Sequence, residues 1–211
     1  GEFVRLIDGS GAEVAARVAC FDEPLELEVV ERREHSRSEG LELVIGQALL
    51  KGRDFDAAVR RLAELGVARI VPLLTKRVVP DLNESAVVSR LERWRAVSRA
   101  ATKQSRGVFL TEIAAPASLE EFGIGAADAD ARLVAWEECS SRLPNELREL
   151  RQSQSAVCVV GPEGGLEADE VAGLQDVGFV SVSLGRRVLR ADWAAAALAM
   201  VLSQKSGGLL P

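Results

Sequence analysis

Strands and helices alternate along most of this chain, and that alternation limits its fold more than any other feature of the sequence. Five apolar runs read as buried strands, at residues 41–49, 67–74, 131–138, 156–161 and 179–185. Helical patterns separate and follow them, at residues 54–65, 85–103, 145–150, 166–177 and 191–205. Asp54 is the expected N-cap of the first helix, and Gly66 is expected to end it. Such alternation over about 160 residues predicts an α/β fold with a mainly parallel sheet.

The first residues follow a different pattern. Residues 2–8, 13–21 and 25–31 read as short strands joined by turns, with Leu25, Leu27 and Val29 on one face of the last. This predicts a small antiparallel sheet or a partial barrel, with a start that reads as if an upstream strand were missing. The pattern breaks at "REHSRSEG", so we expect a domain boundary between residues 38 and 39.

The composition restricts where the protein can be located and which side chains can take part in its chemistry. No apolar run approaches the roughly 20 residues of a membrane helix, and the polar start does not read as a signal peptide. The three cysteines, Cys20, Cys139 and Cys158, are far apart and include no C-x-x-C pair. They predict reduced thiols in a cytoplasmic protein and no metal site. The single histidine, His35, lies in a charged run and is expected to be an exposed bystander.

The net charge of −6 hides an uneven distribution. Residues 51–110 carry 13 Lys/Arg against 6 Asp/Glu, whereas residues 111–211 carry 8 against 15. A concentrated basic segment can bind nucleic acid even in an acidic protein. A solvated helix face with mixed charges explains the same counts, so both interpretations stay open.

A glycine-rich loop, "GPEGG" at residues 161–165, lies between a predicted strand and a predicted helix. Such loops often hold phosphates, but this one lacks the Lys and Ser/Thr of a Walker loop and does not fit G-x-G-x-x-G. Acidic side chains also surround it: Glu163, Glu167, Asp169 and Glu170. They would repel an anion from the helix N-terminus. The loop therefore suits a neutral or cationic ligand, such as an adenosyl group or a sulfonium, or else it is simply a tight turn before an acidic-capped helix.

Two further loops follow predicted strands. One covers residues 183–193, where Leu184 and Gly185 end a strand and Arg190 precedes the last helix; the other is "AWEE" at residues 135–138. Ligands of open α/β sheets bind at the carboxyl ends of strands. We therefore expect these loops and the glycine-rich loop to converge on one pocket.

Taken together, "GPEGGLEADEV" and the later "LGRRVLR" resemble motifs of the ribosomal RNA small-subunit uridine-N3 methyltransferases, a family of the SPOUT superfamily. "GQALLKGRDFDAAVRRLAELGVARIVPLLTKRVV" and "RWRAVSRAATKQSRGVFLTEI" are also similar to that family. The resemblance implies a trefoil-knotted SPOUT methyltransferase domain over residues 39–211 and a truncated PUA-like β domain over residues 1–38. It further implies a homodimer.

The resemblance implies a reaction as well: S-adenosylmethionine-dependent methylation of N3 of a uridine in 16S ribosomal RNA, free or within the small ribosomal subunit. The implied cofactor-binding residues are Ala135, Trp136, Glu137, Gly161, Pro162, Glu163, Gly164, Gly165, Leu184, Gly185, Val188, Leu189 and Arg190. The implied RNA-binding residues are Lys51, Arg53, Arg77, Gln104 and Arg106.

Arg190 and Asp192 are the candidate catalytic residues. Arg190 would stabilise the negative charge that develops on O2 or O4 of the uridine, unless it only forms an ion pair with Glu163 or Asp192 at the helix end. The base that removes the N3 proton is left open among solvent, Asp192 and Glu163.

The chain departs from the family pattern at a few positions. Ala191-Asp192-Trp193 stands where Thr-Glu-Thr is expected, Arg186 replaces a proline, Arg106-Gly107 reverses a Gly-Arg pair, and Lys76 replaces a glutamate. Trp193 is expected to narrow the pocket or to stack on a base. The alternative function is therefore a catalytically impaired SPOUT-fold protein that binds RNA or assists ribosome assembly. An enzyme that binds nucleotide phosphates is disfavoured by the acidic helix start.

Overall fold

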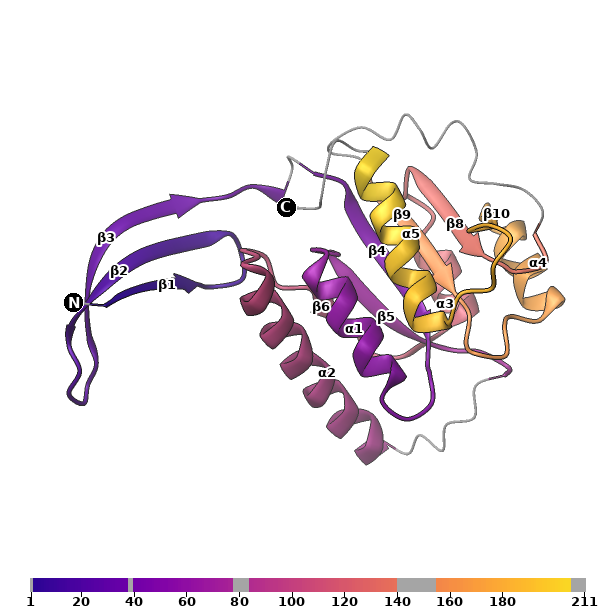
Figure 1. The fold of residues 1–211 in the computed structure, drawn as a ribbon. Helices are drawn as coiled ribbons and strands as arrows, with labels where there is room; N and C mark the ends of the chain where they lie inside the picture. Colours follow the sequence, from indigo (N-terminus) through magenta and orange to yellow (C-terminus); the bar gives the residue numbers. More distant parts are fainter. Residues whose placement is uncertain (1, 38–39, 78–83, 140–154, 206–211) are drawn as a thin grey trace.

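The computed structural model describes residues 2–37, 40–77, 84–139 and 155–205. It contains two separate sheets, of which the smaller projects from the larger body (Figure 1). The smaller sheet is antiparallel, in the order β1 (Phe3–Ile7), β2 (Ala12–Cys20) and β3 (Glu26–Glu34). This agrees with the predicted N-terminal sheet. The predicted boundary falls at residues 38–39, outside the described residues, and stays a prediction.

The larger sheet is parallel throughout its described pairings, in the order β10-β8-β9-β4-β5-β6, with β7 also paired to β5. Its strands are β4 (Glu42–Ala48), β5 (Arg69–Leu74), β6 (Glu112–Ile113), β7 (Ala117–Ser118), β8 (Ala131–Ala135), β9 (Ser155–Val160) and β10 (Val180–Val182). The predicted mainly parallel α/β fold is confirmed. The knot and the PUA-like character of the small sheet are consistent with this topology and stay predictions.

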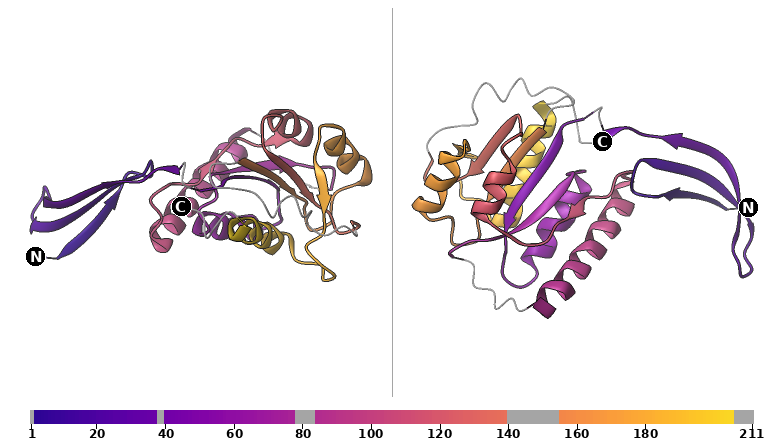
Figure 2. Two further views of the ribbon diagram at one scale, coloured as in Figure 1. Left: turned by 90° about the horizontal axis from the view of Figure 1, so that it is seen from above. Right: turned by 180° about the vertical axis from the view of Figure 1, so that it is seen from behind.

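Helices cover both faces of the large sheet (Figure 2). One face carries α1 (Asp54–Glu64), α2 (Glu84–Ser105) and α5 (Ala191–Lys205); the other carries α3 (Leu119–Gly125) and α4 (Ala168–Asp176). Each layer has its own apolar core. In the first, the rings of Phe55 and Trp94 pack with their centroids 4.4 Å apart. In the second, Phe122 and Leu174 pack against strand residues such as Val159. Burial on both faces explains why the strands read as continuous apolar runs.

The predicted ends of α1 are partly correct. Asp54 is not the N-cap but the first helical residue; Arg53 is the N-cap and provides no side-chain hydrogen bond. Gly66 does follow the helix with φ 79°, the left-handed conformation that glycine adopts without strain. The helix predicted at residues 145–150 lies outside the described residues.

The small sheet is attached to the body at the turn between β1 and β2. The Gly9 carbonyl accepts a hydrogen bond of 2.9 Å from the Leu110 N–H. Arg37 donates to the Leu110 carbonyl over 2.8 Å and lies above the Phe109 ring, 4.8 Å from its centroid. A Cβ at Gly11 would collide with Phe109, so the turn approaches the body closely.

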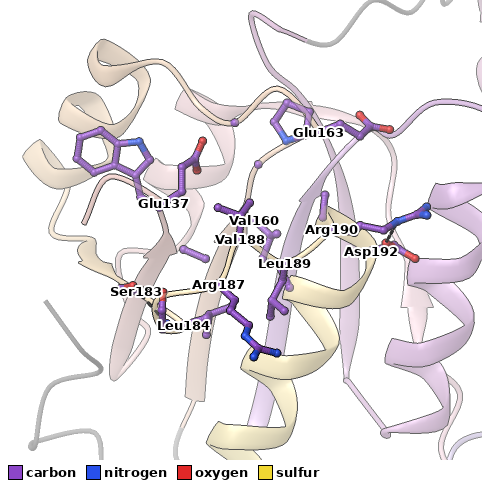
Figure 3. Close-up of a pocket in the computed structure, with 18 of the residues that line it drawn as sticks. Glu137, Val160, Glu163, Ser183, Leu184, Arg187, Val188, Leu189, Arg190 and Asp192 are labelled. Carbon is purple, nitrogen blue, oxygen red and sulfur yellow. Dashed lines mark hydrogen bonds and ion pairs between the residues drawn. The ribbon is translucent and has the colours of Figure 1, made fainter. Parts of the chain in front are cut away.

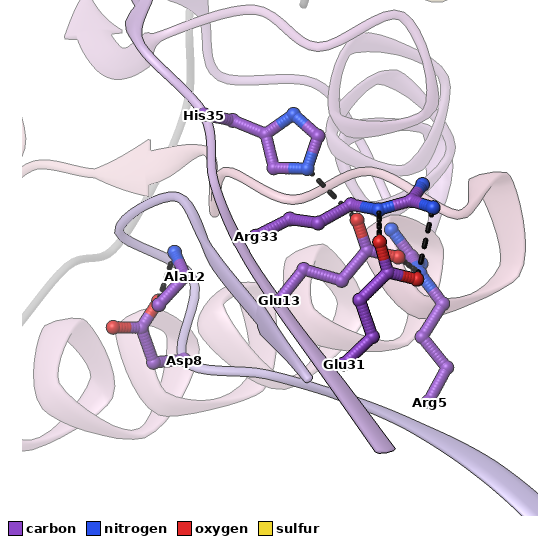
Figure 4. Close-up of polar contacts among 7 residues, drawn as sticks. All are labelled: Arg5, Asp8, Ala12, Glu13, Glu31, Arg33 and His35. Carbon is purple, nitrogen blue, oxygen red and sulfur yellow. Dashed lines mark hydrogen bonds and ion pairs between the residues drawn. The ribbon is translucent and has the colours of Figure 1, made fainter. Parts of the chain in front are cut away.

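Charged residues cover one face of the small sheet (Figure 4). Glu13 accepts hydrogen bonds from Arg5 and, over 2.8 Å, from His35; Arg33 pairs with Glu31 at 2.7 Å. Arg5 first, and then His35, lowers the pKa of the Glu13 carboxyl. His35 is therefore exposed as predicted, but it is not a bystander, because it is paired with Glu13.

The end of α2 offers a test of local strain. Arg106 adopts φ 61°, and the Gly107 N–H donates to the Thr102 carbonyl over 3.0 Å, which closes the helix. A non-glycine residue in this conformation costs about 1–2 kcal/mol. We expect Arg106→Gly to raise the free energy of unfolding by about 0.5–1 kcal/mol, after the greater freedom of glycine in the unfolded chain is subtracted.

Urea unfolding would measure this change. Gly107→Ala is the matched control, because its Cβ would meet Thr102 Cγ2 at 3.2 Å, a contact that a small shift relieves. The control is expected to change stability by less than about 0.5 kcal/mol. A less stable Arg106→Gly protein would contradict the interpretation.

Candidate functional site

A cavity of about 540 Å³ opens where β8, β9 and β10 end (Figure 3). The three loops predicted to converge do surround it, and we call it the strand-end cavity. The predicted residues that line it are Ala135, Trp136, Glu137, Gly161, Pro162, Glu163, Gly165, Leu184, Gly185, Val188, Leu189, Arg190 and Asp192. Among the predicted cofactor-binding residues, only Gly164 is not part of the described lining. Its carbonyl accepts a hydrogen bond from Arg77, and it faces that side chain instead of the cavity.

Close approaches shape the glycine-rich loop. Gly165 has φ 73°, and a Cβ there would overlap the Glu137 carboxylate. Glu163 ties the loop to the end of β4, because its Oε1 accepts a hydrogen bond of 2.8 Å from the Lys51 N–H. Gln47, fully buried, also donates to the Gly161 carbonyl over 3.4 Å. The loop is thus a fixed wall of the cavity.

The acidic start of α4 has its own partners. Glu167 and Glu170 form a capping box, and the Glu170 carboxylate also accepts from the Lys76 N–H over 2.8 Å. Lys76 pairs with Asp169, which lowers the pKa of that carboxyl, and Arg77 lies 3.6 Å from Glu167. Of the four acidic residues named from the sequence, only Glu163 lines the cavity. The acidic-capped helix start is therefore present, and Glu163, in the loop before it, lines the cavity.

Arg190 is held by carboxylates from two elements. Its Nη2 lies 2.8 Å from Asp54 Oδ2 on α1, and its Nε lies 3.3 Å from Asp192 Oδ1. The predicted ion pair with Asp192 is thus present, whereas Glu163 bonds to Lys51 instead. The guanidinium is still largely solvent-accessible, and its ion pairs set its direction at the rim of the cavity (Figure 3).

Asp192 is only 4% exposed, and its second carboxylate oxygen pairs with Arg61 of α1. Since guanidinium groups contact both oxygens, Asp192 is poorly suited to accept a proton and well suited to orient Arg190. Asp54 and Arg61 are seven residues apart, so they share one face of α1. That spacing is visible in the sequence, but it does not reveal their partners.

Trp193 does not occupy the position expected from the sequence. It is 52% exposed, does not line the cavity, and lies beneath the Arg61 guanidinium, 4.2 Å from ring centroid to Cζ. The prediction that it narrows the pocket is therefore wrong.

Several residues that line the cavity were not predicted from the sequence: Leu50, Asp54, Val160, Val182, Ser183, Arg186, Arg187, Ala191 and Ala194.

The predicted RNA-binding residues do not form one patch on this chain. Lys51 and Arg53 follow β4, and Arg77 follows β5, all at the carboxyl edge of the sheet. Gln104 and Arg106 lie at the far end of α2. That helix has 22 residues, which corresponds to about 33 Å. The Arg77 side chain also donates a hydrogen bond to the Gly164 carbonyl and pairs with Glu167.

No helix of the described residues is both long and apolar enough to cross a bilayer. No three His, Cys, Asp or Glu side chains within the described ranges form a group that could hold a metal ion.

The fold and the cavity define a class: an open parallel α/β protein with a cavity formed by its strand-end loops, where ligands of such folds bind, and with no phosphate loop among the described residues. A family model described as an RNA methyltransferase domain matches residues 37–203. The chain therefore belongs to the RNA methyltransferase family.

Relatives and solved structures agree with that assignment. The chain is 36% identical over 162 residues to ribosomal RNA small subunit methyltransferase E of Mycobacterium tuberculosis, covering 73% of this chain and 60% of the relative. It is 27% identical over 168 residues to the protein of the same name from Mesomycoplasma hyopneumoniae, covering 80% and 72%. The fold matches that of the Neisseria gonorrhoeae protein of this name, solved with S-adenosyl methionine, with a TM-score of 0.84 at 24% identity, covering 97% and 84%.

Proposed function

We propose that this chain transfers a methyl group from S-adenosylmethionine to N3 of a uridine in 16S ribosomal RNA, acting as a cytoplasmic homodimer. In this proposal residues 39–211 form the catalytic domain and residues 1–38 contribute RNA contacts. The observation that carries the proposal is the convergence of three strand-end loops on one cavity in a member of the RNA methyltransferase family. The names of its relatives support ribosomal RNA as the substrate.

The cavity fits the cofactor. Its volume of about 540 Å³ lies within the range of about 300–1,000 Å³ for small-molecule sites. A Cβ at Gly161 would meet Leu166 and one at Gly165 would overlap the Glu137 carboxylate, so only glycine lets the loop pack this closely at the cavity wall. The carboxylates of Glu137 and Glu163 line the cavity together with three arginines, so both the sulfonium and the carboxylate of the cofactor have charge partners there. The buried Trp136 indole N–H lacks a described partner. These residues would hold S-adenosylmethionine, which supplies an electrophilic methyl group on a sulfonium.

The side chains at the rim provide the remaining chemistry. The uridine becomes more negative as N3 loses its proton, and Arg190 can donate hydrogen bonds to the oxygen that gains the charge. Asp54 and Asp192 orient that guanidinium. The proton would pass to solvent or to Glu163, because the Asp192 oxygens are engaged. Much of the rate enhancement then comes from positioning.

Isothermal calorimetry tests the cofactor site. The protein is expected to bind S-adenosylmethionine and its demethylated product with micromolar affinity. Gly165→Ala should weaken binding at least about tenfold, since the new Cβ displaces Glu137 and the left-handed backbone disfavours alanine. Gly173→Ala is the matched control: it lies exposed on α4 with nothing near its Cβ, and it should bind as the parent protein does.

Mass spectrometry of 16S RNA treated with protein and labelled cofactor would test the reaction itself. The expected result is one added methyl group on a uridine. Cofactor binding without methyl transfer would favour the alternative, a catalytically impaired RNA-binding or ribosome-assembly protein. Absence of any heat with either cofactor form would overturn the proposal.

A further inference from the structure

A second cavity, of about 440 Å³, lies between α2 and the edge strand β6. We call it the α2 groove. It is lined by Arg69, Arg95, Ser98, Arg99, Leu110, Thr111, Glu112, Ile113, Ala114 and Ala115. The strand-end cavity lies at the carboxyl ends of β8, β9 and β10 and shares no lining residue with the α2 groove, so the two are separate.

The floor of the groove is held in place. The Ser98 hydroxyl donates to the Thr111 carbonyl over 2.9 Å, and Arg95 donates to the Ile113 carbonyl over 3.4 Å. Ala114 and Ala115, which have small side chains, also line the groove. None of the described residues that line it is aromatic, whereas protein interfaces gain most from aromatic anchors.

Four cations elsewhere in the basic segment are already paired with carboxylates of the protein. Arg61 pairs with Asp192, Arg93 with Asp56, and Lys76 with Asp169. Arg77 likewise lies near Glu167. These residues add little positive charge for an external ligand.

The cations along the α2 groove differ from these four residues because most of them have no carboxylate partner among the described residues. Arg95, Arg99 and Lys103 recur every four residues, so they share one flank of α2, and none forms an ion pair with the described residues. Like charges at this spacing repel by about 0.2–0.5 kcal/mol per pair. Only Arg69 has an acidic partner, Glu112, at 3.4 Å with both side chains about half exposed. Such an exposed pair contributes little and is easily exchanged.

We propose that the α2 groove binds backbone phosphates of the RNA substrate, with Arg95 and Arg99 as the principal contacts. This inference rests on the proposed function, because it takes RNA as the partner. Guanidinium groups match phosphate oxygens in a two-pronged geometry. Leu110 lines the groove and also bonds to Gly9 of the small sheet, so an RNA strand in the groove would run beside that sheet.

Fluorescence anisotropy with a labelled 16S RNA fragment, at several salt concentrations, tests the inference. Arg95→Gln/Arg99→Gln should weaken binding about tenfold or more near 0.1 M salt. It should also reduce the slope of log affinity against log salt by about one for each arginine. Calorimetry with S-adenosylmethionine on the same variant should match the parent protein, which separates this inference from the proposed function.

Arg60→Gln is the matched control for Arg99→Gln, because Arg60 is exposed on α1 and its substitution removes the same single charge. The single variant Arg99→Gln provides the measurement if the double variant does not fold. Unchanged RNA affinity and salt slope in the groove variants would overturn the inference. So would an equal loss in Arg60→Gln, or binding of polyglutamate as tight as that of RNA.

Discussion

Arg61→Met is expected to lower the free energy of unfolding by about 3 kcal/mol, because removal of one partner leaves a buried charge poorly compensated. Asp192 is 4% exposed and would retain only Arg190, whose Nε lies 3.3 Å away. The substitution also removes the guanidinium that covers the Trp193 ring. Urea unfolding followed by circular dichroism would measure the loss.

Two further variants make that result specific. Arg60→Met lies one residue away on the same helix, is exposed, and should change stability by less than about 0.5 kcal/mol. Arg61→Met/Asp192→Asn should recover much of the loss, since the buried negative charge is gone. Equal stabilities for the Arg61→Met and parent proteins would show that the pair contributes nothing.

Arg190→Gln is expected to slow methyl transfer by about 10²–10³-fold, the usual cost of removing one donor to a developing oxyanion. Arg190→Lys keeps the positive charge but loses the planar pair of guanidinium N–H donors, so it should recover only part of the rate. Single-turnover measurements with saturating RNA and cofactor would separate this effect from binding.

Asp54→Asn distinguishes a positioning role from a structural one. Asp54 bonds to the Arg190 guanidinium at 2.8 Å. Asp54→Asn should lower kcat by a smaller factor than Arg190→Gln does, and its affinity for the cofactor should stay within about threefold of that of the parent protein. A fully active Arg190→Gln protein would exclude this arginine from the chemistry.

The fold was largely predictable because its strands are buried on both faces. Each buried strand therefore appears as an apolar run. β4, β5, β8 and β10 fall within the ranges expected from the sequence, and β9 begins one residue earlier than expected. The start of α1 was predicted wrongly because an acidic residue favours both the N-cap and the first turn. Only the backbone conformation, in which Arg53 occupies the N-cap, separates these positions.

The candidate site was predictable only as a set of loops. The rule that ligands bind at the carboxyl ends of strands brought the three loops together. It did not indicate which glycine faces the cavity, because that depends on the geometry of the turn at Gly164 and Gly165. Nor did it reveal the pair between Arg190 and Asp54, whose 136-residue separation leaves no periodic signal.

The strand order also has a consequence for how the chain assembles. β4 lies at the centre of the large sheet, yet its neighbour β9 begins at Ser155, more than 100 residues later. During synthesis, one side of β4 therefore has no partner until more than 100 further residues have been added. Such late, non-local pairing slows folding and exposes an apolar strand edge. We expect chains that end before Ser155 to aggregate, and helper proteins to matter most during that interval.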